Sequence, residues 1–129
     1  MVAPYTLKKL TEIEDSAPQF GIGEIQEARF AKKPLETAET AVTYLRVKPG
    51  KRQGFGHRHD EAEEIYVVLS GSGRVKLGDD IVEIGPLDAL RVAPTVIRQF
   101  EAGPDGLDLL AFGRRRDGDG EVVPGWWSD

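Results

Sequence analysis

The sequence has no cysteine and only two histidines among its 129 residues. The lack of cysteine excludes disulfides, thiol nucleophiles and zinc–thiolate sites, and it fits a reducing, cytoplasmic location. The sequence also lacks an apolar run of membrane-spanning length and a charged-then-apolar leader, so we expect no membrane or targeting segment. The formal net charge of −5 argues against nucleic acid or an anionic membrane as a partner.

Helical periodicity is scarce, whereas short apolar segments are frequent. We expect strands at 24–30, 41–47, 64–70, 73–77, 80–84, 89–93, 97–102 and 107–113. Glycine-rich and proline-containing turns separate the later strands, at 71–73, 78–79, 85–86 and 103–106. Many short strands with such turns predict an all-β sandwich or barrel, and a double-sheet jelly roll would resolve its exposed edges.

The chain is expected to form a single domain over residues 1–129. We divide it into an N-terminal arm (1–23), a barrel (24–113) and a C-terminal tail (114–129). The arm fits either a short helical turn or an edge strand, and 31–40 is expected to be a loop. Three arginines followed by three acids make the start of the tail nearly neutral, which indicates a solvated segment. Trp126 and Trp127 would fasten the tail to the barrel or to a subunit interface.

Both histidines lie in one stretch, His57-Arg58-His59, which is followed by an acidic segment and an apolar strand. Residues two apart on a strand point to the same face, so the two imidazoles lie together and Arg58 points away. A carboxylate at the start of the next strand, such as Glu64, can meet them. Two imidazole nitrogens and one carboxylate oxygen are suitable ligands for a divalent transition metal.

The same stretch resembles the first motif of the cupin family: His, any residue, His, three or four residues, Glu, six residues, Gly. His57, His59, Glu64 and Gly71 match it, and the spacing selects Glu64 over Glu63. The resemblance implies the cupin fold, a double-stranded β-helix or jelly-roll barrel. It also implies a metal site at His57, His59 and Glu64 for a divalent transition metal such as iron, manganese, zinc or nickel.

The second cupin motif lacks its key residues, because its histidine would fall at Arg98 and its asparagine at Ala102. Arginine has no lone pair to give a metal. In one interpretation the three remaining ligands hold a metal, and Arg98 turns away or binds an anionic substrate beside it. In the other, Arg98 replaces the metal, pairs with Glu64 and selects carboxylates or phosphates. A register slip could instead bring Gln99 inward as a weak ligand.

Strand parity extends the expected pocket beyond these ligands. Tyr66 shares a face with Glu64, and Phe100 shares a face with Arg98. Tyr44 would join them if its face of the 41–47 strand points inward, and the outward orientation is the alternative. We therefore predict that Arg98, Tyr66, Phe100 and Tyr44 contact a small-molecule ligand.

The strand after Glu64 is apolar on both faces. Ile65, Val67 and Leu69 point away from the expected cavity, and a strand that is apolar on both faces must be covered on both. We therefore expect a homodimer through this outer surface.

Three classes of function fit these observations. The chain could be an enzyme whose metal activates water, dioxygen or an enolisable substrate. It could be a module that captures a small anion through Arg98, or a dimeric scaffold. The cupin family includes dioxygenases, isomerases, decarboxylases, storage proteins and sensor domains, so the resemblance assigns neither a reaction nor catalytic residues.

Overall fold

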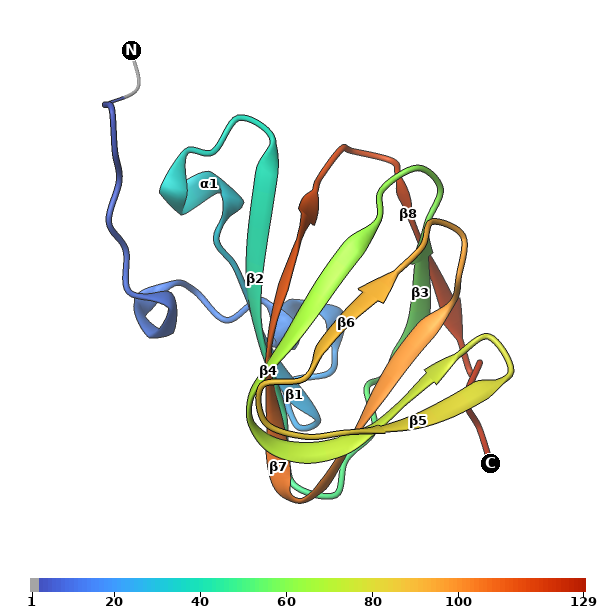
Figure 1. Cartoon of the computed structure of the whole chain (residues 1–129). Helices are drawn as coiled ribbons and strands as arrows, with labels where there is room; N and C mark the ends of the chain where they lie inside the picture. The colour runs from blue at the N-terminus through green and yellow to red at the C-terminus, as the bar shows by residue number, and fades with distance from the viewer. Residues whose placement is uncertain (1–2) are drawn as a thin grey trace.

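The structure is a computed structural model that describes residues 3–129 (Figure 1). Its regular elements are the 3-10 turns η1 (Leu10–Glu12) and η2 (Ala17–Phe20), the helix α1 (Lys32–Leu35), and eight strands. The strands are β1 (Gln26–Phe30), β2 (Thr40–Val47), β3 (Phe55–His59), β4 (Glu64–Leu77), β5 (Asp80–Ile84), β6 (Ala89–Val92), β7 (Arg98–Arg114) and β8 (Gly120–Pro124). The expected all-β class is confirmed.

The strands form one curled antiparallel sheet in the order β1-β2-β7-β3-β8, and β4 pairs with β5, β6 and β7. The two longest strands, β4 and β7, lie against each other from Glu64 opposite Gly113 to Leu77 opposite Arg98. Because each bends along its length, the sheet closes into a jelly-roll barrel (Figure 1). β4 and β7 begin at opposite ends of this shared ladder. The curl of the sheet nevertheless brings the first residues of both strands close to β3.

The expected turns at 71–73 and 103–106 are wrong, since both segments continue β4 and β7. Two glycines let the strands bend without parting. A Cβ atom on Gly71 would lie 2.0 Å from the Gly106 carbonyl oxygen, and one on Gly73 would lie 2.1 Å from that of Glu101. The pairing register shifts on either side of Gly71, which marks irregularities of the β-bulge type. Glycine therefore bends the paired strands here rather than ending them.

The barrel interior holds a cluster of aliphatic and aromatic side chains, including Tyr66, Val68, Phe100, Leu107 and Leu109, each at most 2% exposed. This confirms the inward parity expected for Tyr66 and Phe100. Burying such side chains is the main favourable term for a barrel of this size.

In β2 the inward residues are Ala41, Thr43, Leu45 and Val47. Tyr44 therefore points outward, and the orientation that would have placed it in the pocket is wrong.

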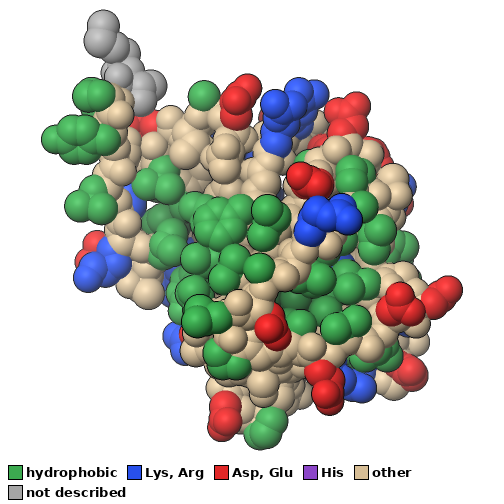
Figure 2. All heavy atoms as spheres, viewed as in Figure 1, with side chains coloured by type: hydrophobic (Ala, Val, Ile, Leu, Met, Phe, Trp, Pro, Cys, Tyr) green, Lys and Arg blue, Asp and Glu red, His purple; other side chains and the backbone are tan. Residues whose placement is uncertain are grey.

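An apolar surface lies outside the barrel, and we call it the outer apolar face. It consists of Ile65, Val67 and Leu69 of β4, Leu110 and Phe112 of β7, and Val42 of β2. Ile65 and Leu69 remain 42% and 43% exposed. Figure 2 shows hydrophobic side chains gathered over β2, β4 and β7 in the middle of this view. The outward orientation expected for these residues of β4 is therefore confirmed.

The later part of the C-terminal tail belongs to the sheet, so the barrel extends beyond the expected limit at 113, whereas 114–118 are exposed, as expected of a solvated segment. The strand β8 pairs along all of β3, from Phe55 opposite Pro124 to His59 opposite Gly120. Trp127 is 4% exposed, and the guanidinium of Arg52 lies 4.0 Å from its ring centroid. The expected fastening of the tail to the barrel is thus confirmed for Trp127.

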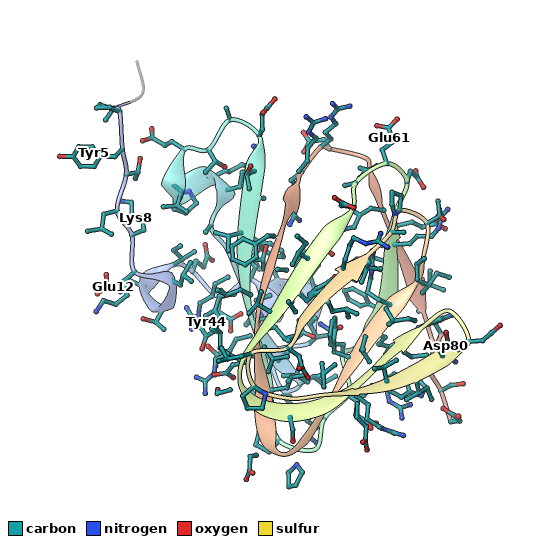
Figure 3. The ribbon with its side chains drawn as sticks, in the orientation of Figure 1. Tyr5, Lys8, Glu12, Tyr44, Glu61 and Asp80 are labelled. Atoms are coloured by element: carbon teal, nitrogen blue, oxygen red, sulfur yellow. The ribbon has the colours of Figure 1, made fainter. Side chains whose placement is uncertain are left out.

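The N-terminal arm forms the short turns η1 and η2, in line with the helical alternative, and residues 3–9, before η1, extend away from the barrel (Figure 3). Tyr5 and Leu7 are 83% and 90% exposed. Between the arm and β2 lies a groove of about 1070 Å³. None of the predicted metal ligands lines this groove. No helix in the part of the chain that the structure describes is long and apolar enough to cross a membrane.

Candidate metal centre

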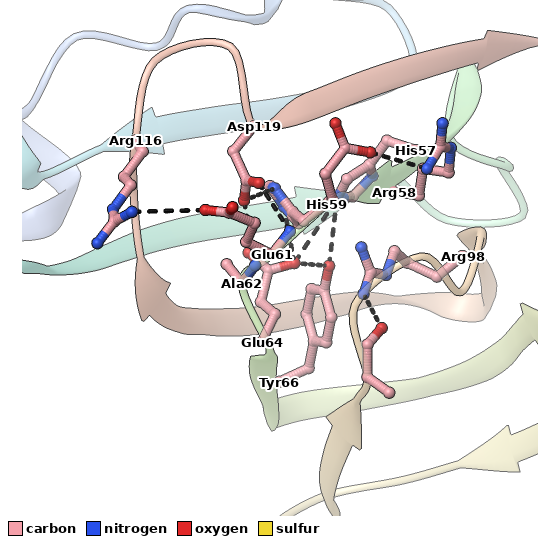
Figure 4. A network of polar contacts seen from close by, with 12 residues as sticks. His57, Arg58, His59, Glu61, Ala62, Glu64, Tyr66, Arg98, Arg116 and Asp119 are labelled. Atoms are coloured by element: carbon pink, nitrogen blue, oxygen red, sulfur yellow. Dashed lines mark hydrogen bonds and ion pairs between the residues drawn. The ribbon is translucent and has the colours of Figure 1, made fainter.

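The three predicted ligands meet where β3 ends and β4 begins (Figure 4). His57 and His59 share one face of β3, and Glu64 is the first residue of β4. The Nε2 atoms of both histidines lie 3.6 Å from Oε1 of Glu64. One ligand atom from each residue lies within 4.8 Å of the others. We call these residues the ligand trio.

The spacing of the ligand trio fits a metal ion. Zinc and similar ions lie about 2.0–2.2 Å from nitrogen and oxygen ligands, so tetrahedral ligand atoms are about 3.4 Å apart. The observed separations of 3.6 Å are close to this value. The ligand trio could therefore hold one metal ion after small side-chain movements, with further coordination positions left open.

The Glu64 carboxyl is kept ionised by its neighbours. Burial alone would raise its pKa, but hydrogen bonds from His57, His59 and Tyr66 outweigh this effect and hold the pKa well below its usual range. The Tyr66 hydroxyl donates one of these bonds to Oε1. A carboxylate is the form that binds a metal.

The His57 imidazole is kept neutral. Burial lowers its pKa most, and the nearby charges of Arg98 and His59 lower it further, whereas Glu64 acts in the opposite direction. A neutral imidazole has a lone pair free for a metal, so this shift favours the ligand form of His57.

Tyr66 lies directly behind the ligand trio. Besides its bond to Glu64, its hydroxyl lies 3.4 Å from Nε2 of His57, and its ring lies 4.7 Å from that of Phe100. Burial, followed by the charge of Glu64, raises the pKa of Tyr66 well above its ordinary value. The phenol is thus a protonated hydrogen-bond donor at the site, and Phe100 fixes the ring beside it.

Arg98 lies opposite His57 in the pairing of β3 with β7, and its side chain is fully buried. The only hydrogen bond of its side chain in the described structure runs from Nη2 to the Ala93 carbonyl oxygen at 3.4 Å, and Nε and Nη1 have no partner. Figure 4 shows it extending toward Tyr66. Within residues 3–129 it forms no ion pair with Glu64, so the pairing expected in the metal-free interpretation is not present.

Gln99 does not join the ligand trio. It follows Arg98 on β7 and therefore points to the opposite face, where its Nε2 donates to the Gln53 carbonyl oxygen at 2.7 Å. The register slip considered from the sequence does not occur.

Tyr44 also lies away from the ligand trio. Its hydroxyl donates to Asp108 at 3.2 Å on the outer surface, where Arg46 contacts the same carboxylate. Tyr44 therefore does not line the barrel interior as predicted for a ligand contact, and the outward alternative is the orientation observed.

Asp119 is a site residue that the sequence did not indicate. Its Oδ2 lies 3.6 Å from Nδ1 of His59, the ring nitrogen that does not face Glu64. Its carboxylate also accepts hydrogen bonds from the backbone N–H groups of Glu61 and Ala62, at 2.8 and 3.2 Å. No motif spacing links this residue to the histidines. The pairing of β8 with β3 alone brings it there.

Comparisons with known proteins agree with this architecture. The family model described as the cupin domain matches residues 43–110, just over half of the chain. A comparison with curated protein sequences gave no match.

Several solved structures are similar to the chain. A cupin protein from Bacteroides fragilis has a TM-score of 0.71 and 22% identity, covering 91% of this chain and 89% of its own. Pac13 from Streptomyces, a nucleoside dehydratase, has a TM-score of 0.72 and 14% identity, covering 96% and 92%. Oxalate decarboxylase from Bacillus subtilis has a TM-score of 0.77 and 17% identity, covering 95% of this chain and 32% of its own. At these identities the likeness concerns the fold, and together with the matched domain it shows that the chain belongs to the cupin family.

Proposed function

We propose that this cupin binds one divalent transition metal ion through His57, His59 and Glu64, together with a small anionic molecule in the barrel. The observation that carries the proposal is the convergence of both Nε2 atoms on Oε1 of Glu64 at 3.6 Å. The side chains of the ligand trio keep 17–25% of their surface exposed, so solvent and a ligand can reach them.

The donor set favours iron, manganese, zinc or nickel over calcium or magnesium, because imidazole is a poor ligand for the latter two. When bound, such an ion supplies a Lewis acid that polarises an oxygen atom or acidifies a water molecule. The residues of this chain supply the rest. Glu64 stays ionised, Asp119 orients His59, and Tyr66 holds a proton beside the site.

Arg98 supports the anionic character of the second ligand. Guanidinium groups form strong charge-assisted hydrogen bonds with carboxylates and phosphates. A buried cation without a counter-ion is costly, and Arg98 has two unpaired nitrogen donors. An oxyanion in the barrel would satisfy both the charge and the donors.

The reaction stays open, because relatives of similar fold carry names as different as nucleoside dehydratase and oxalate decarboxylase. A second candidate is a metal-free cupin that binds a small anion with Arg98 as its cation. The position of Arg98 opposite His57 favours this metal-free candidate. The lack of an ion pair between Arg98 and Glu64 in the described residues argues against it.

Elemental analysis of untagged protein, purified without chelator and then supplied with each of the four metals, tests the proposal. We expect close to one ion per chain, and a large loss in H57A, H59A and E64Q. The matched control is E63Q, because Glu63 is an exposed carboxylate beside Glu64 in the sequence. If the wild type takes up no metal, or if E63Q loses metal as fully as E64Q, the ligand trio is not the metal site.

We also propose that the chain forms a homodimer through the outer apolar face. Ile65 and Val42 both flank Phe112 in the paired strands, so the exposed residues form a continuous row across three strands. Isologous dimers commonly bury apolar patches of this kind.

A further inference from the structure

The buried end of the candidate site carries a positive charge that no carboxylate of the described residues contacts directly. Arg98 is 0% exposed, and Nε and Nη1 have no hydrogen-bond partner. Buried polar groups are nearly always hydrogen-bonded, so an orphaned guanidinium in a well-packed barrel requires an explanation. Glu64, the carboxylate of the ligand trio, is already engaged by the two histidines and Tyr66.

A divalent metal would reverse the sign of the net charge around the site. The negative charges are Glu64, within the ligand trio, and Asp119, behind His59. Together with Arg98 they leave one net negative charge, which a divalent ion would turn into one net positive charge. Like charges repel strongly in a partly buried site, where water screens them poorly. Arg98 alone therefore weakens metal binding.

An oxyanion would reverse this effect. It could occupy an open position at the metal while accepting hydrogen bonds from Nε and Nη1 of Arg98. The histidines are partly exposed and the guanidinium is enclosed, so the ligand trio lies on the side from which an anion would enter.

We propose that Arg98 couples the two ligands, so that the metal binds tightly only together with a small carboxylate or phosphate, and the anion binds tightly only with the metal. The coupling rests on the proposed metal site, and it defines the second ligand as an oxyanion that contacts the metal. Linkage of this kind is reciprocal, so either ligand can report it.

Calorimetric titration with Mn²⁺ tests the coupling. The wild-type protein is titrated in chloride buffer, then with added acetate, inorganic phosphate or, as the neutral counterpart of acetate, acetamide. We expect acetate or phosphate to tighten Mn²⁺ binding by about tenfold, within the usual range of coupling between sites, and acetamide to have no effect. The comparison of acetate with phosphate shows which oxyanion the site takes.

Two variants separate Arg98 from the rest of the site. R98M removes the charge at similar volume, and R98H supplies the histidine that the cupin motif has at this position. Both should bind Mn²⁺ more tightly than the wild type in chloride buffer, and neither should respond to acetate or phosphate. R91M is the matched control, since Arg91 is an exposed arginine on β6, and it should behave as the wild type does.

The possible failures are distinct. If wild-type and R98M proteins bind Mn²⁺ equally well and the oxyanions change nothing, the coupling is overturned and the metal site stands. If no protein binds Mn²⁺ or the other metals in any buffer, the proposed metal function fails and the coupling fails with it. The wild-type comparison decides the matter even if R98M does not fold, because it needs no variant.

Discussion

The carboxylate of Asp119 lies 3.6 Å from Nδ1 of His59, while Nε2 of the same ring lies 3.6 Å from Glu64 (Figure 4). Asp119 is held in turn by the backbone N–H groups of Glu61 and Ala62. The imidazole is therefore fixed between a carboxylate from the tail and a ligand from β4. Carboxylates in this position set the tautomer of a metal-binding histidine and increase its basicity.

Replacing Asp119 should weaken metal binding without removing a ligand. We expect D119N to bind the metal about 10- to 100-fold more weakly, as is typical when the partner of a ligand histidine is lost. Calorimetric titration with Zn²⁺ measures the change. D117N is the control, because Asp117 is an exposed acid two residues away in the same loop. Equal affinities of D119N and the wild type would show that Asp119 does not position His59.

Charge placed on the outer apolar face should separate the proposed dimer. We expect the wild type to be dimeric and I65E or L69E to be monomeric, because a buried carboxylate without a partner is strongly unfavourable. Light scattering coupled to size-exclusion chromatography gives the mass. V82E is the control, since Val82 on β5 is 42% exposed but lies outside this face. A monomeric wild type would rule out the dimer.

Trp127 should contribute much of the stability of the tail. Its ring is 4% exposed and stacked on Arg52, whose Nη1 also donates to the Trp127 carbonyl oxygen at 2.8 Å. We expect W127A to lower the free energy of unfolding by about 3 kcal/mol, as for other large aromatic side chains removed from a core. Urea denaturation measures this loss. W126A should lower the free energy of unfolding by less, because Trp126 is only half-buried. Equal losses in W126A and W127A would contradict the larger contribution of Trp127.

Glu101 should make stability depend on pH in the acid range. Burial would raise its pKa, but hydrogen bonds from Arg74 and Arg52 dominate and lower it. A glutamate in the unfolded chain has a pKa of about 4.3. Because the pKa of Glu101 is lower in the folded state, the folded protein binds the proton less readily. The stabilisation is therefore complete above this pKa and is lost as the pH falls through the lower, folded-state pKa.

The corresponding measurement is the free energy of unfolding of the wild type and E101Q at a series of pH values from 6 to 3. We expect the wild type to be the more stable protein at pH 6, and the difference to shrink steadily as the pH falls. E83Q serves as the control because Glu83 is an exposed carboxylate on β5, a strand that pairs with β4 and not with β7. A difference that stays constant with pH would mean that Glu101 is not the group responsible.

The ligand trio could be predicted because its members are close in the sequence. His57 and His59 share a face by strand parity alone, and a short loop returns the chain to Glu64. Tyr66 follows from the same parity, two residues beyond Glu64. These relationships need only the period of a strand, which local sequence determines.

Tyr44, in contrast, could not be oriented from its sequence. Both faces of its strand carry apolar residues, and pairing between β1, β2 and β7 decides which face meets the core. The bends at Gly71 and Gly73 were misread as turns for a related reason, because glycine serves both turns and bulges.

The sequence by itself determined the all-β class, the ligand trio and the arginine at the position of the missing histidine, because each depends on residue type and local spacing. The tertiary structure alone decided that Asp119 reaches His59, that the tail forms β8, and that Arg98 lies buried without a counter-ion. Those contacts join segments about 40 to 70 residues apart, and they arise from strand pairing and barrel closure, which no local pattern encodes.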